Sequence, residues 1–252
     1  MGNKVFVFDL DDTLMWNNYN YDRAKIAFLE WLMKIFDRRV PSSTYILTLQ
    51  EELDKKVGSE INPETGKQFG FTRQRFPTSF VRTYQALCDE GWGKYQPCLA
   101  QEAYDLGLIA FDRAQYRKAG LVVGAQKVLN YLAAEGHRLH LVTKGDEQIQ
   151  EAKIDALNLG QSFDNIQITE GSKKDIFGSI RKFYIDSRVF SVGNSFSSDI
   201  KPALEVGCEA IFIPCYTWSA ESIEVEKLPE DWQKIFWKIK KIEQILDIYP
   251  QL

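Results

Sequence analysis

The chain has 252 residues, 44% of them hydrophobic, and a net charge of −4 at pH 7, which suits one large domain or a domain with an insert. The acidic balance argues against nucleic acid as the main partner, because proteins that bind phosphate backbones usually carry a basic face. No apolar run approaches the roughly 18 residues of a membrane span and the first residues lack a signal-peptide pattern, so we expect a cytoplasmic protein without membrane contact.

The first predicted element is a strand within VFVFDLDDTL, residues 5–14. Residues 5–8 are apolar without alternation, which indicates a strand buried on both faces. The strand leads into Asp9, Asp11 and Asp12, whose like charges cost free energy unless a positive group compensates them. Residues two apart in an extended chain face the same way, so we expect the side chains of Asp9 and Asp11 to point in the same direction. We expect Asp12 to face away, in a structural or solvated role.

About a hundred residues of helical pattern follow, and no strand pattern in them is convincing. Four apolar stripes recur at helical spacing: Ile26, Leu29, Met33 and Phe36; Ile46, Leu49 and Leu53; Phe80, Tyr84 and Leu87; Leu99, Ala103, Leu106 and Ala110. A segment rich in turn residues, containing FTRQRFP, separates the second stripe from the third. We expect residues 16–119 to form an all-helical domain.

From Gly120 onward, strand and helix patterns alternate. Predicted strands are LHLVT, IQIT, VFSVGNS and AIFIP, each after a helical segment. A final amphipathic helix is predicted from Ile235, Ile239, Ile242 and Leu246. Repeated alternation predicts an α/β fold, a Rossmann-like parallel sheet with helices on both faces. Residues 1–15 and 120–252 would form this core, interrupted by the helical domain.

The predicted strands end in residues that suit phosphate chemistry. In an open parallel sheet, ligands bind beyond the carboxyl ends of the strands, near the switch in strand order. The side chains expected there are Asp9, Asp11, Thr143, Asn194 and Asp199, with Lys173 and Lys174 ahead of a helix. A carboxylate can attack phosphorus, a magnesium ion can neutralise charge, and lysine and hydroxyl groups can hold phosphate oxygens.

The segments DLDDT, LVTKGD, SKKDIF and VGNSFSSDI together resemble the four ordered motifs of the haloacid dehalogenase-like phosphohydrolase superfamily. The resemblance covers residues 1–14 and about 120–215, and the insert resembles a helical cap of that superfamily. It implies that Asp9 is the nucleophile, forming an aspartyl-phosphate. It also implies that Asp11 is the general acid that protonates the leaving oxygen and then the base that activates water.

The same resemblance implies a phosphate-binding set and a metal. Thr143, aided by Lys144, and a lysine would hold the phosphate. Both Lys173 and Lys174 are candidates for that lysine, and spacing to the following helix favours Lys173.

Mg²⁺ would be held by Asp9, the Asp11 backbone carbonyl, Asn194 and Asp199. Asn194 stands where the commoner family pattern has Asp. An amide oxygen can bind the ion but supplies no charge.

We therefore expect a magnesium-dependent phosphatase acting on a small phosphorylated metabolite. Asp11 favours phosphatase over dehalogenase, because halide leaves without protonation whereas an alkoxide benefits from an acid. A phosphomutase and a non-catalytic phospho-ligand binder are the alternatives. Arg75, in FTRQRFP, is the predicted substrate-binding residue, with an ordinary exposed arginine as the equal alternative. The sequence does not indicate the substrate's identity or the oligomeric state.

Overall fold

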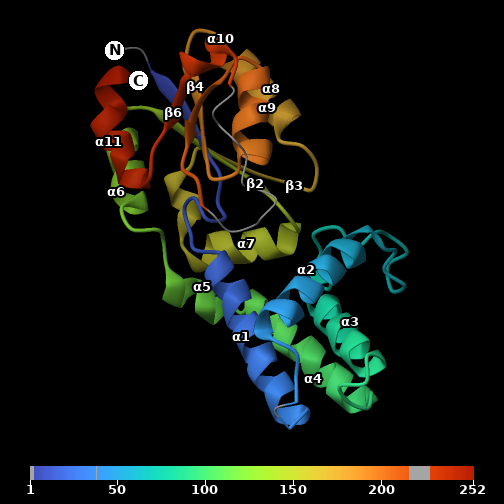
Figure 1. The fold of residues 1–252 in the computed structure, drawn as a ribbon. Helices are drawn as coiled ribbons and strands as arrows, with labels where there is room; N and C mark the ends of the chain where they lie inside the picture. Colours follow the sequence, from blue (N-terminus) through green and yellow to red (C-terminus); the bar gives the residue numbers. More distant parts are fainter. Residues whose placement is uncertain (1–2, 38, 216–227) are drawn as a thin grey trace. The chain divides into compact units, whose positions relative to one another are not determined.

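A computed structural model describes residues 3–37, 39–215 and 228–252 (Figure 1). The chain divides into two compact units: a sheet unit, Met1–Asn18 with Tyr116–Leu252, and a helical unit, Tyr19–Gln115. Within the described part of the chain, every helix is too short or too polar to span a bilayer.

The sheet unit is built on six parallel strands in the order β3-β2-β1-β4-β5-β6. The strands are β1 (Lys4–Phe8), β2 (Arg138–Lys144), β3 (Asn165–Thr169), β4 (Arg188–Gly193), β5 (Glu209–Phe212) and β6 (Phe236–Lys238). Its helices are α6 (Ala125–Ala134), α7 (Glu147–Ala156), α8 (Lys174–Phe183), α9 (Lys201–Glu205), α10 (Glu230–Gln233) and α11 (Ile245–Ile248). The predicted Rossmann-like α/β fold is confirmed, and its strand order reverses at β1, which has β2 on one side and β4 on the other.

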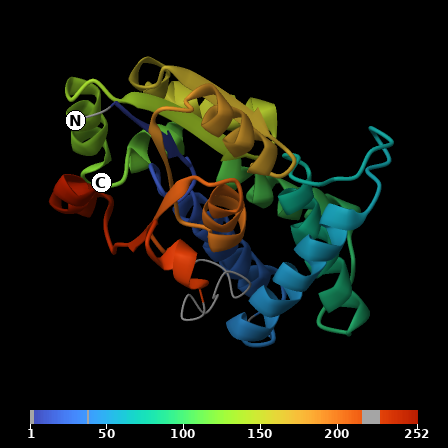
Figure 2. The ribbon, with the colours of Figure 1, turned by 90° about the horizontal axis from the view of Figure 1, so that it is seen from above.

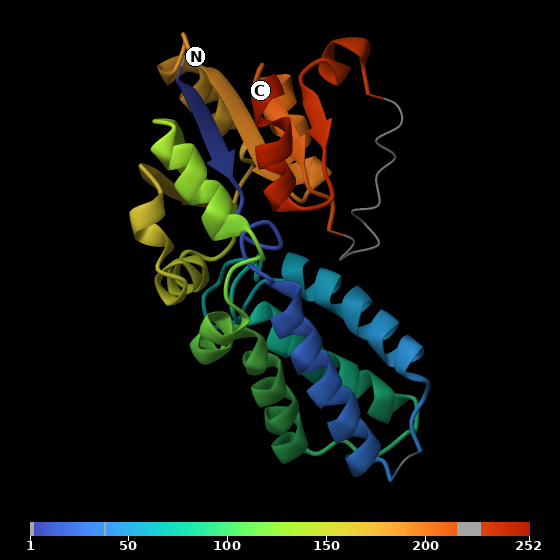
Figure 3. The same cartoon turned by 90° about the vertical axis from the view of Figure 1, so that its left-hand side faces the viewer.

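Helices cover both faces of the sheet, with α6 and α11 on one face and α8 and α9 on the other (Figures 1 and 3). Side chains of β1 alternate between these faces. Phe6 and Phe8 pack in the cluster that includes α6 and α11, while Val5 and Val7 pack against α8 and α9. Asp9 lies two residues after Val7, so the same alternation directs its side chain toward the face that α8 covers.

The helical unit contains α1 (Asn18–Ile35), which begins in the last residue of the sheet unit, α2 (Ser43–Ser59), α3 (Arg75–Asp89), α4 (Pro97–Leu108) and the start of α5 (Arg113–Ala119). Helix α3 packs against both α2 and α4, and α2 and α3 lie side by side in Figure 2. Stacked rings fill the space between α1 and α3, with the Phe28 and Phe80 centroids 4.3 Å apart. In α1 the stripe predicted from Ile26 and Met33 is wrong, because these side chains are 56% and 43% exposed while Phe28 is buried.

The predicted C-terminal helix is also wrong. In its place the chain forms strand β6, then short helical turns at Ile242–Gln244 and α11. Strand β6 pairs with β5, with Ala210 opposite Phe236. Backbone pairing along the sheet edge outweighs the helical spacing of the isoleucines, while Ile239 and Ile242 still enter the core.

Candidate functional site

The candidate site lies at the carboxyl ends of β1 and β4, the two neighbouring strands between which the strand order reverses. Strand β1 ends at Phe8 and is followed by Asp9, whose backbone N–H donates to the Val192 carbonyl of β4 at 2.9 Å. Strand β4 ends at Gly193 and is followed by Asn194. Ligands bind at such a switch point because the connecting loops diverge there and leave a crevice.

A compact loop fixes the direction of the acidic residues after β1. The Leu10 carbonyl accepts hydrogen bonds from the N–H groups of both Leu14 and Met15. Asp12 takes a left-handed conformation (φ 58°), and its carboxylate accepts from the N–H groups of Asn17 and Asn18, where α1 begins. Burial raises the pKa of Asp12 to about 7, against the lowering effect of these bonds. Asp12 is thus a buried structural residue, and the solvated alternative is wrong.

Lys173 joins two of the predicted carboxylates. Its Nζ lies 2.6 Å from Asp9 Oδ1 and 2.7 Å from Asp199 Oδ1, and its side chain is 2% exposed. The residue directly precedes α8, so it extends from the end of the helix that covers the Asp9 face. Lys174, the other candidate, instead pairs with Glu205 at 2.8 Å and is half exposed. The structure therefore places Lys173 in the cluster and Lys174 outside it.

This buried ion cluster shifts the pKa values of its members. Burial raises the pKa of Asp9; Lys173 opposes the increase, and the carboxylates of Asp199 and Asp11 add to it. Burial alone would lower the pKa of Lys173, but Asp199 and Asp9 outweigh burial and raise it. Lys173 thus stays charged, whereas Asp9 carries its charge at a free-energy cost that a further bound cation would reduce.

The loop after β4 supplies the remaining oxygen atoms. Asp199 Oδ2 accepts the Ser195 N–H at 3.0 Å, and the Ser191 hydroxyl donates to the Asp199 carbonyl at 2.9 Å. A Cβ atom at Gly193 would lie 2.4 Å from Asp199 Oδ2, so only glycine allows this approach. The Thr13 hydroxyl lies 3.3 Å from Asp9 Oδ2 and 3.2 Å from Asn194 Oδ1, which places these two oxygens around one hydroxyl.

A second ion pair holds Asp11. Lys153 Nζ lies 2.9 Å from Asp11 Oδ1 and 2.8 Å from Oδ2. Gln150 Nε2 donates to the Thr143 hydroxyl at 2.6 Å and to Asp11 Oδ2 at 3.1 Å. Thr143 at the end of β2 is thereby brought beside Asp11, and the Lys144 carbonyl contacts the same Nε2 at 3.3 Å.

Gln150 and Lys153 are site residues that the sequence motifs do not include. Apolar side chains are the usual sign of the inner face of a helix, but on α7 Gln150 and Lys153 are buried while Ile149 and Ala152 are only half-buried. The available signal was a polar stripe at positions 146, 150 and 153, which has helical spacing and directly follows a strand end in the site.

Comparison with known proteins finds similar sequences and similar solved structures. No family model matches the sequence. A glyceraldehyde 3-phosphate phosphatase of Pyrococcus abyssi is 29% identical, with 83% of this chain and 80% of the relative aligned. One of Methanothermobacter thermautotrophicus is 26% identical over 89% of this chain and 91% of the relative.

Solved structures share the fold over nearly the whole chain. A haloacid dehalogenase-like family hydrolase from Xanthomonas campestris superposes with a TM-score of 0.67 at 17% identity, covering 99% of this chain and 95% of the other. A HAD hydrolase from Bacillus subtilis bound to magnesium has a TM-score of 0.56 at 18% identity, with 99% and 100% covered.

In sequence the chain is similar to these phosphatases, and its fold is that of the haloacid dehalogenase-like (HAD) hydrolases.

The oxygen atoms of this site match the ligands that Mg²⁺ prefers, which are hard oxygens from carboxylates and amides. Among the described residues, no three His, Cys, Asp or Glu side chains form a metal-binding group. Asn194, whose Oδ1 contacts the same Thr13 hydroxyl as Asp9 Oδ2, would add a third side-chain oxygen to those of Asp9 and Asp199. The donor chemistry therefore fits magnesium, with less negative charge than three carboxylates would give.

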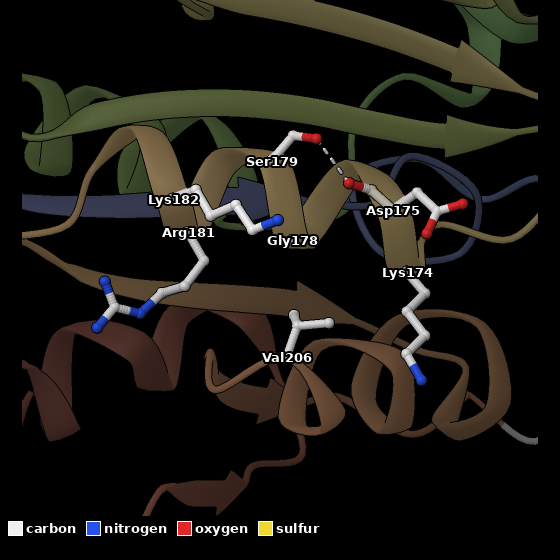
Figure 4. Close-up of a pocket in the computed structure, with 7 residues that line it drawn as sticks. All are labelled: Lys174, Asp175, Gly178, Ser179, Arg181, Lys182 and Val206. Carbon is white, nitrogen blue, oxygen red and sulfur yellow. Dashed lines mark hydrogen bonds between the residues drawn. The ribbon is translucent and has the colours of Figure 1, made fainter.

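A shallow hollow of about 480 Å³ lies elsewhere in the sheet unit, along the outer side of α8 (Figure 4). It is lined by Lys174, Asp175, Gly178, Ser179, Arg181, Lys182 and Val206. Arg181 donates to the carbonyls of Tyr184 and Ile185, so its guanidinium has partners within the chain. None of the Asp9, Asp11 or Thr143 groups lines this hollow.

Arg75, the predicted substrate-binding residue, has partners inside the helical unit. Its guanidinium pairs with Asp54 at 2.6 Å and also donates to the carbonyls of Asp54 and Gly70. Burial raises the pKa of Asp54, more than Arg75 lowers it. These contacts assign Arg75 a role in stabilising the helical unit.

We expect Arg75→Met to destabilise the protein by about 3 kcal/mol, because it leaves the buried Asp54 carboxylate without its cation. Urea unfolding at pH 7 measures the change. Arg82→Met is the matched control on the same helix, since Arg82 and its partner Glu60 are 50% and 33% exposed and such pairs contribute little. Equal stability of the two variants would contradict the structural role of Arg75.

Proposed function

We propose that the protein is a magnesium-dependent phosphatase that hydrolyses a small phosphorylated metabolite through an aspartyl-phosphate on Asp9. The observation that carries this proposal is the Lys173 ammonium between Asp9 and Asp199, with Asp11 held two residues beyond the nucleophile. A carboxylate to attack, a cation for the phosphoryl oxygens and a second carboxyl for proton transfer are what monoester hydrolysis requires.

In the first step, an Asp9 oxygen bonds to phosphorus while the bond from phosphorus to the ester oxygen breaks. Asp11 gives its proton to the departing oxygen, which leaves as an alcohol. In the second step, a water oxygen bonds to phosphorus, the bond to Asp9 breaks and Asp11 takes the proton from the water. Inorganic phosphate is released and both carboxyl groups return to their starting states.

Lys173 and Thr143 bind the phosphoryl oxygens in this scheme, as point charge and hydroxyl donor respectively. Bound magnesium would supply positive charge that offsets the negative charge of the phosphoryl group. Asp9, Asn194, Asp199 and the Asp11 carbonyl would hold it. The helical unit is the proposed cap, which distinguishes one leaving group from another, since the residues that act on the phosphoryl group all come from the sheet unit.

The named relatives suggest glyceraldehyde 3-phosphate as the first substrate to test. The experiment measures phosphate release from p-nitrophenyl phosphate and from a panel of alkyl phosphates that includes glyceraldehyde 3-phosphate, with magnesium. Steady turnover supports an enzyme. Absence of turnover on every compound, with a folded protein, would contradict the proposal and favour a phospho-ligand binder.

Asn194→Asp is expected to lower the magnesium concentration that gives half-maximal activity several-fold. The asparagine amide is neutral, and the variant adds one negative charge beside the ion. The measurement is a magnesium titration of initial rates. An unchanged titration would mean that Asn194 is not a ligand, and full activity in EDTA would exclude the metal.

A further inference from the structure

The proposed function, on which this inference rests, leaves the buried ammonium group of Lys153 unexplained. Lys153 has a side chain that is 3% exposed, and burying a lysine costs solvation free energy unless it is paired. Its partner is the Asp11 carboxylate, which it contacts through both oxygens. Lys173 already contacts the nucleophile, so Lys153 has a different task.

Gln150 completes the same arrangement from one turn earlier on α7, because residues three apart lie on one helix face. Its side chain is 1% exposed, and its Nε2 group contacts Thr143 and Asp11. At Gly145 a Cβ atom would lie 3.3 Å from the Gln150 side chain, and φ there is +151°, so glycine leaves room for the amide. The Asp11 carboxylate is thus tied to the strand that carries Thr143.

These contacts determine which oxygen of the Asp11 carboxylate can still accept a hydrogen bond. A carboxylate has about four lone-pair positions, two on each oxygen. Lys153 takes one on each oxygen, and Gln150 takes the second on Oδ2. The remaining position is on Oδ1, and the donors on both oxygens prevent the carboxylate from rotating.

We propose that Lys153, with Gln150, is a positioning residue that presents Oδ1 of Asp11 as the atom for proton transfer. The proton leaves Oδ1 for the ester oxygen as that oxygen separates from phosphorus. It returns to Oδ1 from the attacking water as the bond between phosphorus and Asp9 breaks. Lys153 touches neither substrate nor phosphorus in this role.

The test separates proton transfer from general damage by means of the leaving group. p-Nitrophenolate leaves without protonation, so kcat/KM for p-nitrophenyl phosphate, which reports the first step, does not depend on Asp11 as an acid. For Lys153→Met we expect this kcat/KM to stay within about threefold of wild type. For the alkyl phosphate that the wild type hydrolyses fastest, kcat/KM should fall about 10- to 100-fold, part of the range for general acid catalysis.

The second step still requires Asp11 as a base with both substrates. In Lys153→Met, kcat and KM for p-nitrophenyl phosphate should therefore fall together, with a burst of p-nitrophenol approaching one per enzyme. In an Asp11→Asn background, Lys153→Met should cause no further loss, because the two residues act through one group. Lys153→Arg, which keeps donors for both oxygens, should recover part of the loss.

Arg138→Met is the matched control, since Arg138 forms an exposed ion pair with Asp164 in the same unit and should leave all constants unchanged. Gln150→Met, a second variant should Lys153→Met fail to fold, should show the same leaving-group pattern at smaller amplitude. Equal losses on both substrates, or no loss on either, in an active and folded variant would overturn the inference. An inactive wild type would instead refute the proposed phosphatase.

Discussion

Asp9→Asn is expected to lower turnover more than about a hundredfold, because loss of a covalent nucleophile costs several kcal/mol of activation free energy. The amide keeps the shape of the carboxylate and can still accept from Lys173. Since burial raises the pKa of Asp9, the folded state disfavours its charge, and removing that charge should not reduce stability above that pKa. Phosphate release and thermal unfolding measure the two effects.

Asp12→Asn is the matched control for this result, since Asp12 is also buried and lies in the same loop but faces the start of α1. Asparagine tolerates its left-handed backbone. We expect the Asp12→Asn enzyme to keep turnover within about tenfold of wild type. Residual activity of Asp9→Asn above about a hundredth of wild type would contradict the covalent mechanism.

Lys173→Met is expected to destabilise the protein at neutral pH by about 3–5 kcal/mol, because the buried carboxylates of Asp9 and Asp199 lose their shared cation. Turnover should fall as well. The loss of stability should shrink as pH falls, because protonation of a carboxyl removes the repulsion between the two groups. Urea unfolding at several pH values measures it.

Lys174→Met decides between the two candidate lysines. Lys174 is half exposed and paired with Glu205 on the outer side of α8, so its loss should change neither stability nor turnover appreciably. The opposite pattern, an inactive Lys174→Met enzyme beside a normal Lys173→Met enzyme, would refute the assignment of Lys173.

The sequence by itself determined the parallel α/β core and the order in which polar residues follow its strands. Asp9 and Asn194 directly follow β1 and β4, and Thr143 is the next-to-last residue of β2. The physical reason is local: an apolar run specifies a buried strand, and the polar residue that follows the run therefore lies at the carboxyl end of that strand. Parallel strands all end at one edge, so the topology collects these groups without further information.

Only the tertiary structure decided which side chains of the helices enter the site. Lys173 and Lys174 differ by one residue, and a rotation of about 100° about the helix axis separates a buried cation from a solvated one. On α7, packing buries Gln150 and Lys153 because Asp11, from a distant part of the chain, contacts both of them, and Thr143 on β2 adds a partner for Gln150. The edge strand β6 and the Arg75–Asp54 pair likewise depend on contacts between residues remote in sequence, which periodicity within one segment does not encode.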